Sequence, residues 1–194
     1  TRGDYYGPSA GADLSLAQTV NVGAVVLGNI SGVEYGQAYS FEISANGTMS
    51  QFDFDLAGSI GTPSGTTTLR IETDDGADGP SGTLVDVNAT KTITLTVSAT
   101  NAFIFPASFV LTGSTKYWAV VNMDSAQSGG VYHQMWYNNG TAIAGFGISQ
   151  TTDGGSTWGA EGEIYDWDFK VYATAEQLNM TLVSEPSTAL AVPT

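Results

Sequence analysis

The chain has 194 residues, enough for one domain with a substantial buried core. Its residues are 42% hydrophobic, 11% aromatic and only 12% charged, and the formal net charge is −14. Because 19 acidic residues face only five Lys and Arg, with no basic cluster, binding to nucleic-acid phosphates and to anionic membranes is excluded. The same acidity makes divalent cations natural partners.

The chain contains no cysteine, which excludes disulfides, thiolate metal sites and cysteine nucleophiles. No apolar run approaches the roughly 20 residues that a membrane-spanning helix needs. With few charges, the polar surface must consist of Thr, Ser, Asn and Gly, as is typical of secreted or particle-surface β proteins. We therefore expect an extracellular, cell-surface or virion-surface location.

The first 30 residues differ in composition from the rest. They begin with a Gly-, Pro- and Ser-rich lead that predicts a linker. The run from Val20 to Leu27 predicts a strand, which either joins its own sheet or is added to the sheet of a neighbouring subunit. We divide the chain into an N-terminal linker with a possible subunit-connecting strand (1–30), a β-sandwich (31–174) and a C-terminal edge strand with a linker (175–194).

From about Val33 onward, apolar residues alternate with polar ones. In QFDFDL, residues 51–56, Phe and Leu side chains share one face and the carboxylates the other. Further strands are predicted at 37–43, 67–72, 82–87, 91–97, 102–111, 116–123, 131–137, 141–148 and 164–173. Since turn residues separate them at short intervals and no 3.6-residue period is sustained, we predict an all-β fold, a jelly-roll-like antiparallel β-sandwich with extended ends.

The loop from Thr73 to Gly82, TDDGADGPSG, brings carboxylates and glycines together. Asp74, Asp75 and Asp78 lie close in sequence, and the glycines let backbone carbonyls turn inward, as calcium requires. The loop lacks the D-x-D-x-D-G pattern with its bidentate Glu. A turn with solvated carboxylates explains the same residues. Two predictions therefore stay open for this loop: it binds calcium, or the protein has no cofactor.

The stretch from Thr151 to Ala173 concentrates acidic and aromatic residues. Its carboxylates are Asp153, Glu161, Glu163, Asp166 and Asp168, and its tryptophans are Trp158 and Trp167. Two carboxylates about 5 to 10 Å apart, one held neutral, could hydrolyse a glycoside. The alternation in DWDFKV instead predicts a half-buried strand, and DGGSTW predicts the hairpin turn before it. We therefore predict no catalytic residue and no enzymatic activity.

His133 is the only histidine. A Ser-His-Asp triad would have to use it, and the sequence has no G-x-S-x-G motif. A zinc site made from one histidine without cysteines is also atypical. We predict a surface or hydrogen-bonded strand residue.

Aromatic residues near an Asn/Gly turn form the candidate glycan site. In VYHQMWYNNG, Tyr132, Trp136 and Tyr137 could line a shallow groove in which sugar rings stack on aromatic rings and amides bond the hydroxyls. Strand alternation puts Tyr132 and Trp136 on one face and His133 and Tyr137 on the other, so one set packs inward. Trp158 completes the set of candidates.

Asn-x-Ser/Thr sequons mark candidate glycosylation sites in exposed loops, if the source glycosylates. They lie at Asn29, Asn46, Asn88, Asn139 and Asn179.

Four stretches between about Tyr39 and Ala173 carry a resemblance. They are FDFDL, TLRIETDDGADGPSGTLV, GSTKYWAVVN, and TTDGGSTW followed by YDWDFKVYA. Together they resemble a non-catalytic jelly-roll module of bacterial choice-of-anchor surface proteins and of phage tail or head-fibre proteins. In the tail, EPSTAL also resembles the sorting motif of exported PEP-CTERM proteins. The resemblance implies a structural fold and no catalytic residues.

Three functions remain open, since β-sandwiches host them all. The first is a non-enzymatic structural or adhesion protein, a fibre, filament or decoration subunit that self-assembles through its N-terminal strand or joins other modules and binds glycans. The second is a free carbohydrate-binding module of a larger secreted enzyme. The third is a glycoside hydrolase that uses acids among Glu161, Glu163, Asp166 and Asp168.

Overall fold

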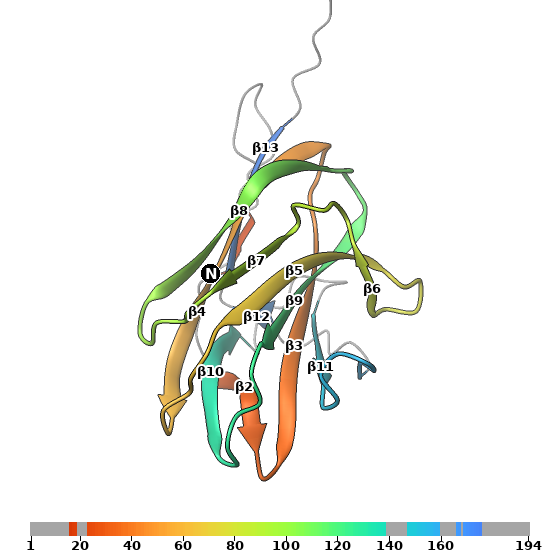
Figure 1. Cartoon of the computed structure of the whole chain (residues 1–194). Coiled ribbons are helices and arrows are strands. Elements are labelled where there is room, and N and C mark those ends of the chain that lie inside the picture. The colour runs from red at the N-terminus through yellow and green to blue at the C-terminus, as the bar shows by residue number, and fades with distance from the viewer. Residues whose placement is uncertain (1–15, 19–22, 139–146, 160–165, 168, 176–194) are drawn as a thin grey trace, which may run out of the picture.

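The computed structural model consists of antiparallel β-strands (Figure 1). It describes residues 16–18, 23–138, 147–159, 166–167 and 169–175. The strands are β1 (Leu16–Gln18), β2 (Gly23–Ile30), β3 (Val33–Glu42), β4 (Gly47–Ile60), β5 (Thr67–Asp74), β6 (Pro80–Leu84), β7 (Thr90–Ile93), β8 (Thr100–Leu111), β9 (Lys116–Met123), β10 (Val131–Asn138), β11 (Ile148–Thr151), β12 (Asp166–Trp167) and β13 (Phe169–Ala175). Within these ranges there is no helix, and so none that could cross a membrane. The predicted all-β antiparallel class is therefore confirmed.

The strand order is that of one curled sheet, β1-β13-β4-β10-β2-β3-β9-β5-β6, with β7, β8, β11 and β12 paired outside this path. The long strand β4 links its parts, because residues 47–55 pair with β8 and residues 56–60 pair with β10. The ladder between β4 and β10 has a bulge at Gln134/Met135, and bulges increase the local twist of a strand. The curl brings β3 over β4 and β13, since Phe41 contacts Phe52 and Tyr39 contacts Phe169.

Aromatic side chains fill the space that the curled sheet encloses. Phe52 of β4 lies between Phe41 of β3 and Phe169 of β13, with ring centroids 6.2 and 5.6 Å apart. Tyr39 of β3 also contacts Phe169, at 4.5 Å. All four are buried, and burying each such side chain stabilises the fold by about 1.5–3 kcal/mol. The two contacts of Phe169 join residues more than a hundred positions apart in sequence.

The strand β2 lies inside the sheet. It pairs with β10 along Gly23 to Asn29 and with β3 along Gly28 to Ile30, and its Leu27 side chain is fully buried. The sequence-based division placed residues 1–30 outside the sandwich as a linker with a connecting strand. Of the two alternatives left open for the run from Val20 to Leu27, the structure shows pairing within its own sheet, which therefore begins before residue 31. On the β3 side only residues 28–30 of β2 are paired.

Most strands predicted from alternation appear within a few residues of their expected ends. The strand predicted at 116–123 matches β9 at both ends, and the one at 102–111 begins two residues late relative to β8. Most of the strand predicted at 141–148 lies outside the described residues, as does the edge strand expected after Ala175. The three-residue strand β1, which pairs with β13, falls in the lead expected to be a linker.

Candidate functional site

One face of β10 presents aromatic and amide side chains outward. His133 and Met135 point into the protein and are buried, while the alternate residues Tyr132, Gln134 and Trp136 are half-buried on the opposite face. We call these three residues the aromatic face. The alternation of side chains along a strand predicted this arrangement, with Tyr132 and Trp136 on one face and His133 on the other.

Small side chains flank the aromatic face on β2. Residues directly opposite each other in an antiparallel pair share a face, and Tyr132, Gln134 and Trp136 stand opposite Gly28, Val26 and Ala24 respectively. On β4, Gly58 stands opposite Gln134 and Ile60 opposite Tyr132. On the β2 side the neighbours of Tyr132 and Trp136 are therefore smaller than these rings, whereas on the β4 side Ile60 stands beside Tyr132.

Gly28 keeps the β2 backbone close to β10. An added Cβ would lie 2.9 Å from the Cα of Tyr132, and the residue has a φ of 125°. That φ lies in the region that glycine adopts at low cost and other residues rarely adopt. This glycine therefore fixes the position of Tyr132 at one end of the aromatic face.

The dimensions of the aromatic face suit an extended ligand. Residues four apart on a strand are separated by about 13 Å, which is the span between Tyr132 and Trp136. Two rings at the ends and an amide between them offer apolar stacking surfaces and hydrogen bonds in one line. Such a line of groups can contact a short oligosaccharide, because sugar rings have apolar faces and polar edges.

The remaining glycan candidates lie elsewhere. The side chain of Tyr137 is outside the described part of the structure. Trp158 is half-buried and packs on a small cluster of Ala38, Trp118 and Val120, on the outer side of β3 and β9. Its packing there explains Trp158 without a ligand.

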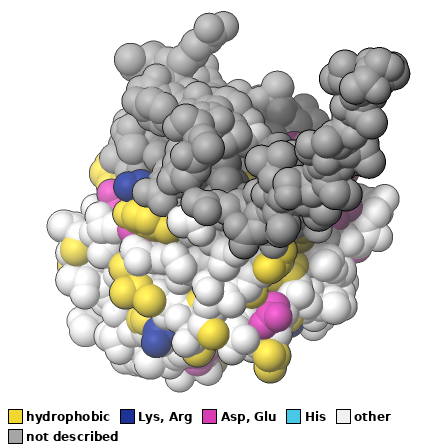
Figure 2. All heavy atoms as spheres, turned by 90° about the horizontal axis from the view of Figure 1, so that it is seen from above, with side chains coloured by type: hydrophobic (Ala, Val, Ile, Leu, Met, Phe, Trp, Pro, Cys, Tyr) yellow, Lys and Arg dark blue, Asp and Glu magenta, His cyan; other side chains and the backbone are white. Residues whose placement is uncertain are grey.

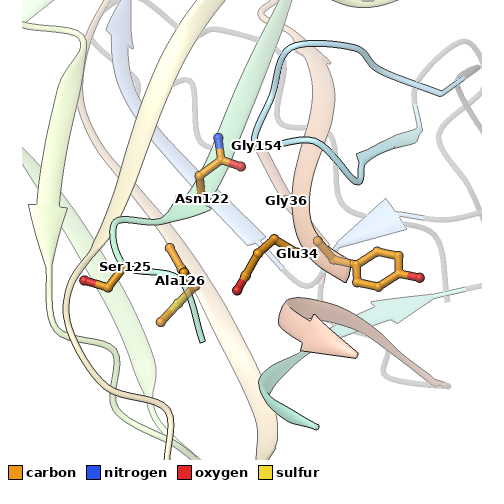
Figure 3. Close-up of a pocket in the computed structure, with 8 residues that line it drawn as sticks. Glu34, Gly36, Asn122, Ser125, Ala126 and Gly154 are labelled. Carbon is orange, nitrogen blue, oxygen red and sulfur yellow. The ribbon is translucent and has the colours of Figure 1, made fainter. Parts of the chain in front are cut away.

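A recess lies beside that cluster, between β3, β9 and the loop that follows β11 (Figure 3). Its volume is about 160 Å³, and it is lined by Glu34, Tyr35, Gly36, Asn122, Met123, Ser125, Ala126 and Gly154. Glu34 is held at its rim, since its Oε1 accepts hydrogen bonds from Asn29 Nδ2 at 3.0 Å and from the Gln127 backbone N at 2.6 Å. No sequence pattern pointed to this recess.

His133 is buried and its Nδ1 lies 2.9 Å from Ser59 Oγ of β4. Burial lowers the pKa of the imidazole, because desolvation disfavours the charged form. The structure thus places His133 as a hydrogen-bonded strand residue.

The carboxylates of the predicted calcium loop point to different partners. Asp74 accepts hydrogen bonds from Trp118 Nε1 at 2.7 Å and from the Gly76 N, and Asp75 accepts from the Ala77 and Gly79 backbones. Asp78 pairs with Lys116 at 3.0 Å. Among the described residues no group of three acidic or histidine side chains converges as a metal site would require. Calcium binding stays a prediction.

The DGGSTW segment is a turn organised by one carboxylate. Asp153 accepts hydrogen bonds from the side chains of Thr157 and Thr151 and from the backbones of Thr157 and Ser156. These bonds, with Thr157 Oγ1 first, hold the pKa of Asp153 well below its usual range. The turn then folds back on β11, where Gly159 N donates to the Gln150 carbonyl at 2.9 Å.

The other acids considered for catalysis cannot be placed. Glu161, Glu163 and Asp168 lie outside the described residues, and so does the side chain of Asp166. In the strand that follows, Phe169 and Val171 are buried and Lys170 is on the opposite face, as the alternation predicted.

The sequons fall in different environments. Asn46 is exposed and Asn88 is half-buried, while Asn139 and Asn179 lie outside the described part of the chain. Asn29 is a correction to the expectation of an exposed loop. It lies in β2, is only 6% exposed and bonds both Glu34 and the Gly32 backbone, so it is not accessible as a glycosylation site.

Comparison with models of known protein families and with curated proteins finds no match to this chain. The arguments for a function therefore come from the sequence and the geometry.

Sequence reasoning missed Gln134 of the aromatic face. Its position two residues after Tyr132 and two before Trp136 is the signal that could have found it, because those three share a face in any regular strand. The recess lacked such a signal, since its residues come from three segments far apart in the chain.

Proposed function

We propose that this protein is a non-enzymatic structural or adhesion protein of a cell or virion surface, and that it binds glycans through the aromatic face of β10. The observation that carries the proposal is the line of Tyr132, Gln134 and Trp136, which are half-buried on one face of a strand that pairs with both β2 and β4. Rigid strands hold such rings in place, so little conformational entropy is lost when a sugar stacks on them.

The chemistry of the described acids supports a binding role over a catalytic one. Asp74, Asp75 and Asp153 bond backbone amides of their own turns, and Asp78 pairs with a lysine. Carboxylates used in this way stabilise loops. A hydrolase needs instead two carboxyl groups facing a common cleft, one of them neutral at working pH.

The acidic charge of the protein favours neutral or cationic glycans as ligands. A net charge of −14 repels sulfated and sialylated chains at long range. A ligand needs no charged group to stack on these rings or to bond the amide of Gln134. We therefore expect neutral oligosaccharides of several rings, long enough to contact Tyr132 and Trp136 together.

A glycan array followed by titration tests the proposal. The wild-type protein is expected to retain neutral oligosaccharides, and Trp136→Ala and Tyr132→Ala each weaken binding by about tenfold, because each removes one stacking surface. Gln134→Ala is expected to weaken it less, since it removes a single hydrogen bond to a neutral group. Equal melting temperatures show that the variants are folded.

Val87→Ala is the matched control. Val87 is an apolar residue that is 82% exposed, in the connection between β6 and β7, away from the aromatic face. Its truncation should leave binding unchanged. Wild-type affinity in both Trp136→Ala and Tyr132→Ala would contradict the proposal.

A further inference from the structure

The recess between β3, β9 and the loop that follows β11 has one charged residue in its lining. That residue is Glu34, and no Lys or Arg is part of the lining. In Figure 3 the carboxylate end of Glu34 points toward the side of the recess formed by Ala126. None of the lining residues belongs to β10, so a ligand of this recess is separate from the glycan proposed for the aromatic face.

One oxygen of the Glu34 carboxylate is engaged and the other is not. Oε1 accepts the hydrogen bonds from Asn29 Nδ2 and the Gln127 backbone N, whereas Oε2 receives none from any residue that the structure describes. Gln127 is only 8% exposed, and its own side chain bonds the Ser64 backbone N and O and the Ser125 carbonyl. This network fixes the orientation of the carboxylate. A ligand that bonds Oε2 therefore loses little free energy to ordering the side chain.

The carboxamide of Asn122 supplies a second acceptor. A Cβ at Gly36 would overlap Asn122 Oδ1, so this oxygen lies directly over the β3 backbone. Gly36 is two residues after Glu34, a distance of about 7 Å along a strand on which both positions face the same side. No described residue forms a hydrogen bond with the Asn122 side chain. The two oxygens together favour a ligand that donates hydrogen bonds in more than one direction.

The size and the apolar part of the lining limit the ligand. Met123 and Ala126 form this part, and Met123 is held by a hydrogen bond from Thr67 Oγ1 to its sulfur at 3.1 Å. The volume of about 160 Å³ is close to that of an engineered cavity of about 150 Å³ that holds benzene. A sugar ring with its hydroxyl groups has roughly twice as many atoms as benzene and is too large to be enclosed. The recess has room for a short methylene chain.

The charge of the chain favours a cation as the ligand. The chain has 19 acidic residues and five basic ones, and in the view of Figure 2 few Lys and Arg side chains appear on the described surface. A net charge of −14 raises the concentration of cations near the protein. A divalent cation such as calcium takes roughly six to eight oxygen ligands, whereas the lining offers a single carboxylate. A cation with an organic chain matches this lining better.

We propose that the recess binds a primary alkylammonium group. The ammonium donates hydrogen bonds to Glu34 Oε2 and Asn122 Oδ1, and the methylene chain lies against Met123 and Ala126. A guanidinium group binds a carboxylate best through both of its oxygens, but Oε1 is already engaged. An ammonium group acts as a point charge and needs only the other oxygen. Free amines and lysine side chains of a partner protein share this chemistry.

A chemical-shift titration of the full chain with n-butylamine tests the proposal, and n-butanol is the uncharged control of the same chain length. We expect saturable shifts that are largest at Gly36, Asn122 and Ala126, with a dissociation constant of about 1–10 mM. The shifts caused by n-butanol should not saturate over the same range. Shifts with n-butylamine that do not saturate, or that spread evenly over the exposed carboxylates, would overturn the proposal, because they show attraction by the net charge alone. Equal binding of n-butanol would overturn it as well.

Glu34→Gln removes the charge but keeps an oxygen that can accept the bonds from Asn29 and Gln127. It should raise the dissociation constant of n-butylamine by at least about tenfold, because a charge-assisted hydrogen bond is lost. Glu42→Gln is the matched control, since it removes the same charge at the far end of β3. It should leave binding unchanged. Wild-type affinity in Glu34→Gln, or equal weakening in both variants, contradicts the proposal.

Ala126→Leu tests the recess without changing the carboxylate. Ala126 is exposed in the connection between β9 and β10, so the variant is expected to fold. Its larger side chain should occupy the space of the methylene chain and weaken binding of n-butylamine by about tenfold. Retained wild-type affinity would place the amine elsewhere and overturn the assignment.

Titration with Nα-acetyl-lysine methylamide beside n-butylamine separates the two sources of the ammonium group. Tighter binding of the lysine derivative assigns the recess to a lysine side chain, and tighter binding of n-butylamine assigns it to a free amine. Binding of neither compound overturns the proposal.

Discussion

A few buried polar side chains each form a hydrogen bond to one partner on another strand of the sheet. His133 of β10 bonds Ser59 of β4, and Trp118 of β9 bonds Asp74 at the end of β5. Each pair joins strands that lie far apart in the sequence. Since an unpaired polar group in the interior costs more than an ordinary hydrogen bond contributes, these residues respond sensitively to pH or substitution.

Stability should fall as the pH is lowered from about 7.5 to 5.5, and His133 should be responsible. Burial lowers its pKa in the folded protein below the ordinary 6.5, so the unfolded chain binds the proton first and stability is lost as the pH falls through that value. His133→Gln should flatten this part of the melting-temperature profile. An unchanged slope in the variant would show that other groups cause it.

Asp53 also makes the stability of the fold depend on pH. Burial raises the pKa of its carboxyl group, while hydrogen bonds from Gln51 and Tyr172 oppose the shift. The folded protein therefore takes up this proton at a higher pH than the unfolded chain does. Its contribution to stability is present below the ordinary value of 3.8 and is lost as the pH rises through the folded pKa, so it carries the opposite sign to that of His133.

Gly36→Ala should destabilise the protein by about 1–3 kcal/mol, because a Cβ has no room there. It would overlap Asn122 Oδ1 and lie 2.7 Å from Thr151 Cγ2. Chemical denaturation measures the loss, and combining the change with Asn122→Ala should recover part of it. If the double variant is no more stable than the sum of the single changes predicts, the overlap with Asn122 is not the cause.

At the scale of elements, the loop after β5 is tied to β9. Asp74 accepts the indole hydrogen of the fully buried Trp118, and Lys116 both pairs with Asp78 and lies 5.4 Å from the centroid of the Trp118 ring. These contacts give the acidic loop a structural role. They also explain why its carboxylates spread apart.

Asp74→Ala should lower the free energy of unfolding by about 1–3 kcal/mol, because it leaves the Trp118 N–H buried without an acceptor. Asp74→Asn keeps an oxygen at that position and should cost clearly less. Urea denaturation of the two variants beside the wild type gives the comparison. Equal losses in both would mean that the charge of Asp74 matters more than its hydrogen bond to Trp118.

Several strands could be predicted from the sequence, but their pairing could not. Alternation located β9 and most of β8, since each has a regular buried side. It also separated His133 from Tyr132 and Trp136. Local patterns could not reveal that β1 pairs with β13, or that β2 lies between β10 and β3, because those pairings depend on distant residues. The recess of Glu34 and Asn122 escaped prediction for the same reason.

At the scale of the whole molecule, β4 connects the strand that carries the aromatic face to the rest of the sheet. Residues 56–60 of β4 pair with β10, which carries the aromatic face, and residues 47–55 pair with the edge strand β8. Because β4 also carries the buried Phe52 and Phe54, the aromatic face rests on the same strand that contributes to the core.

Chemical-shift mapping with the tightest-binding oligosaccharide from the array is the most direct test of glycan binding at β10. The account predicts that the largest shifts fall on Tyr132, Gln134 and Trp136 and on the residues opposite them in β2 and β4. Shifts centred on the recess around Glu34 and Asn122, or no saturable shifts with any glycan, would contradict it.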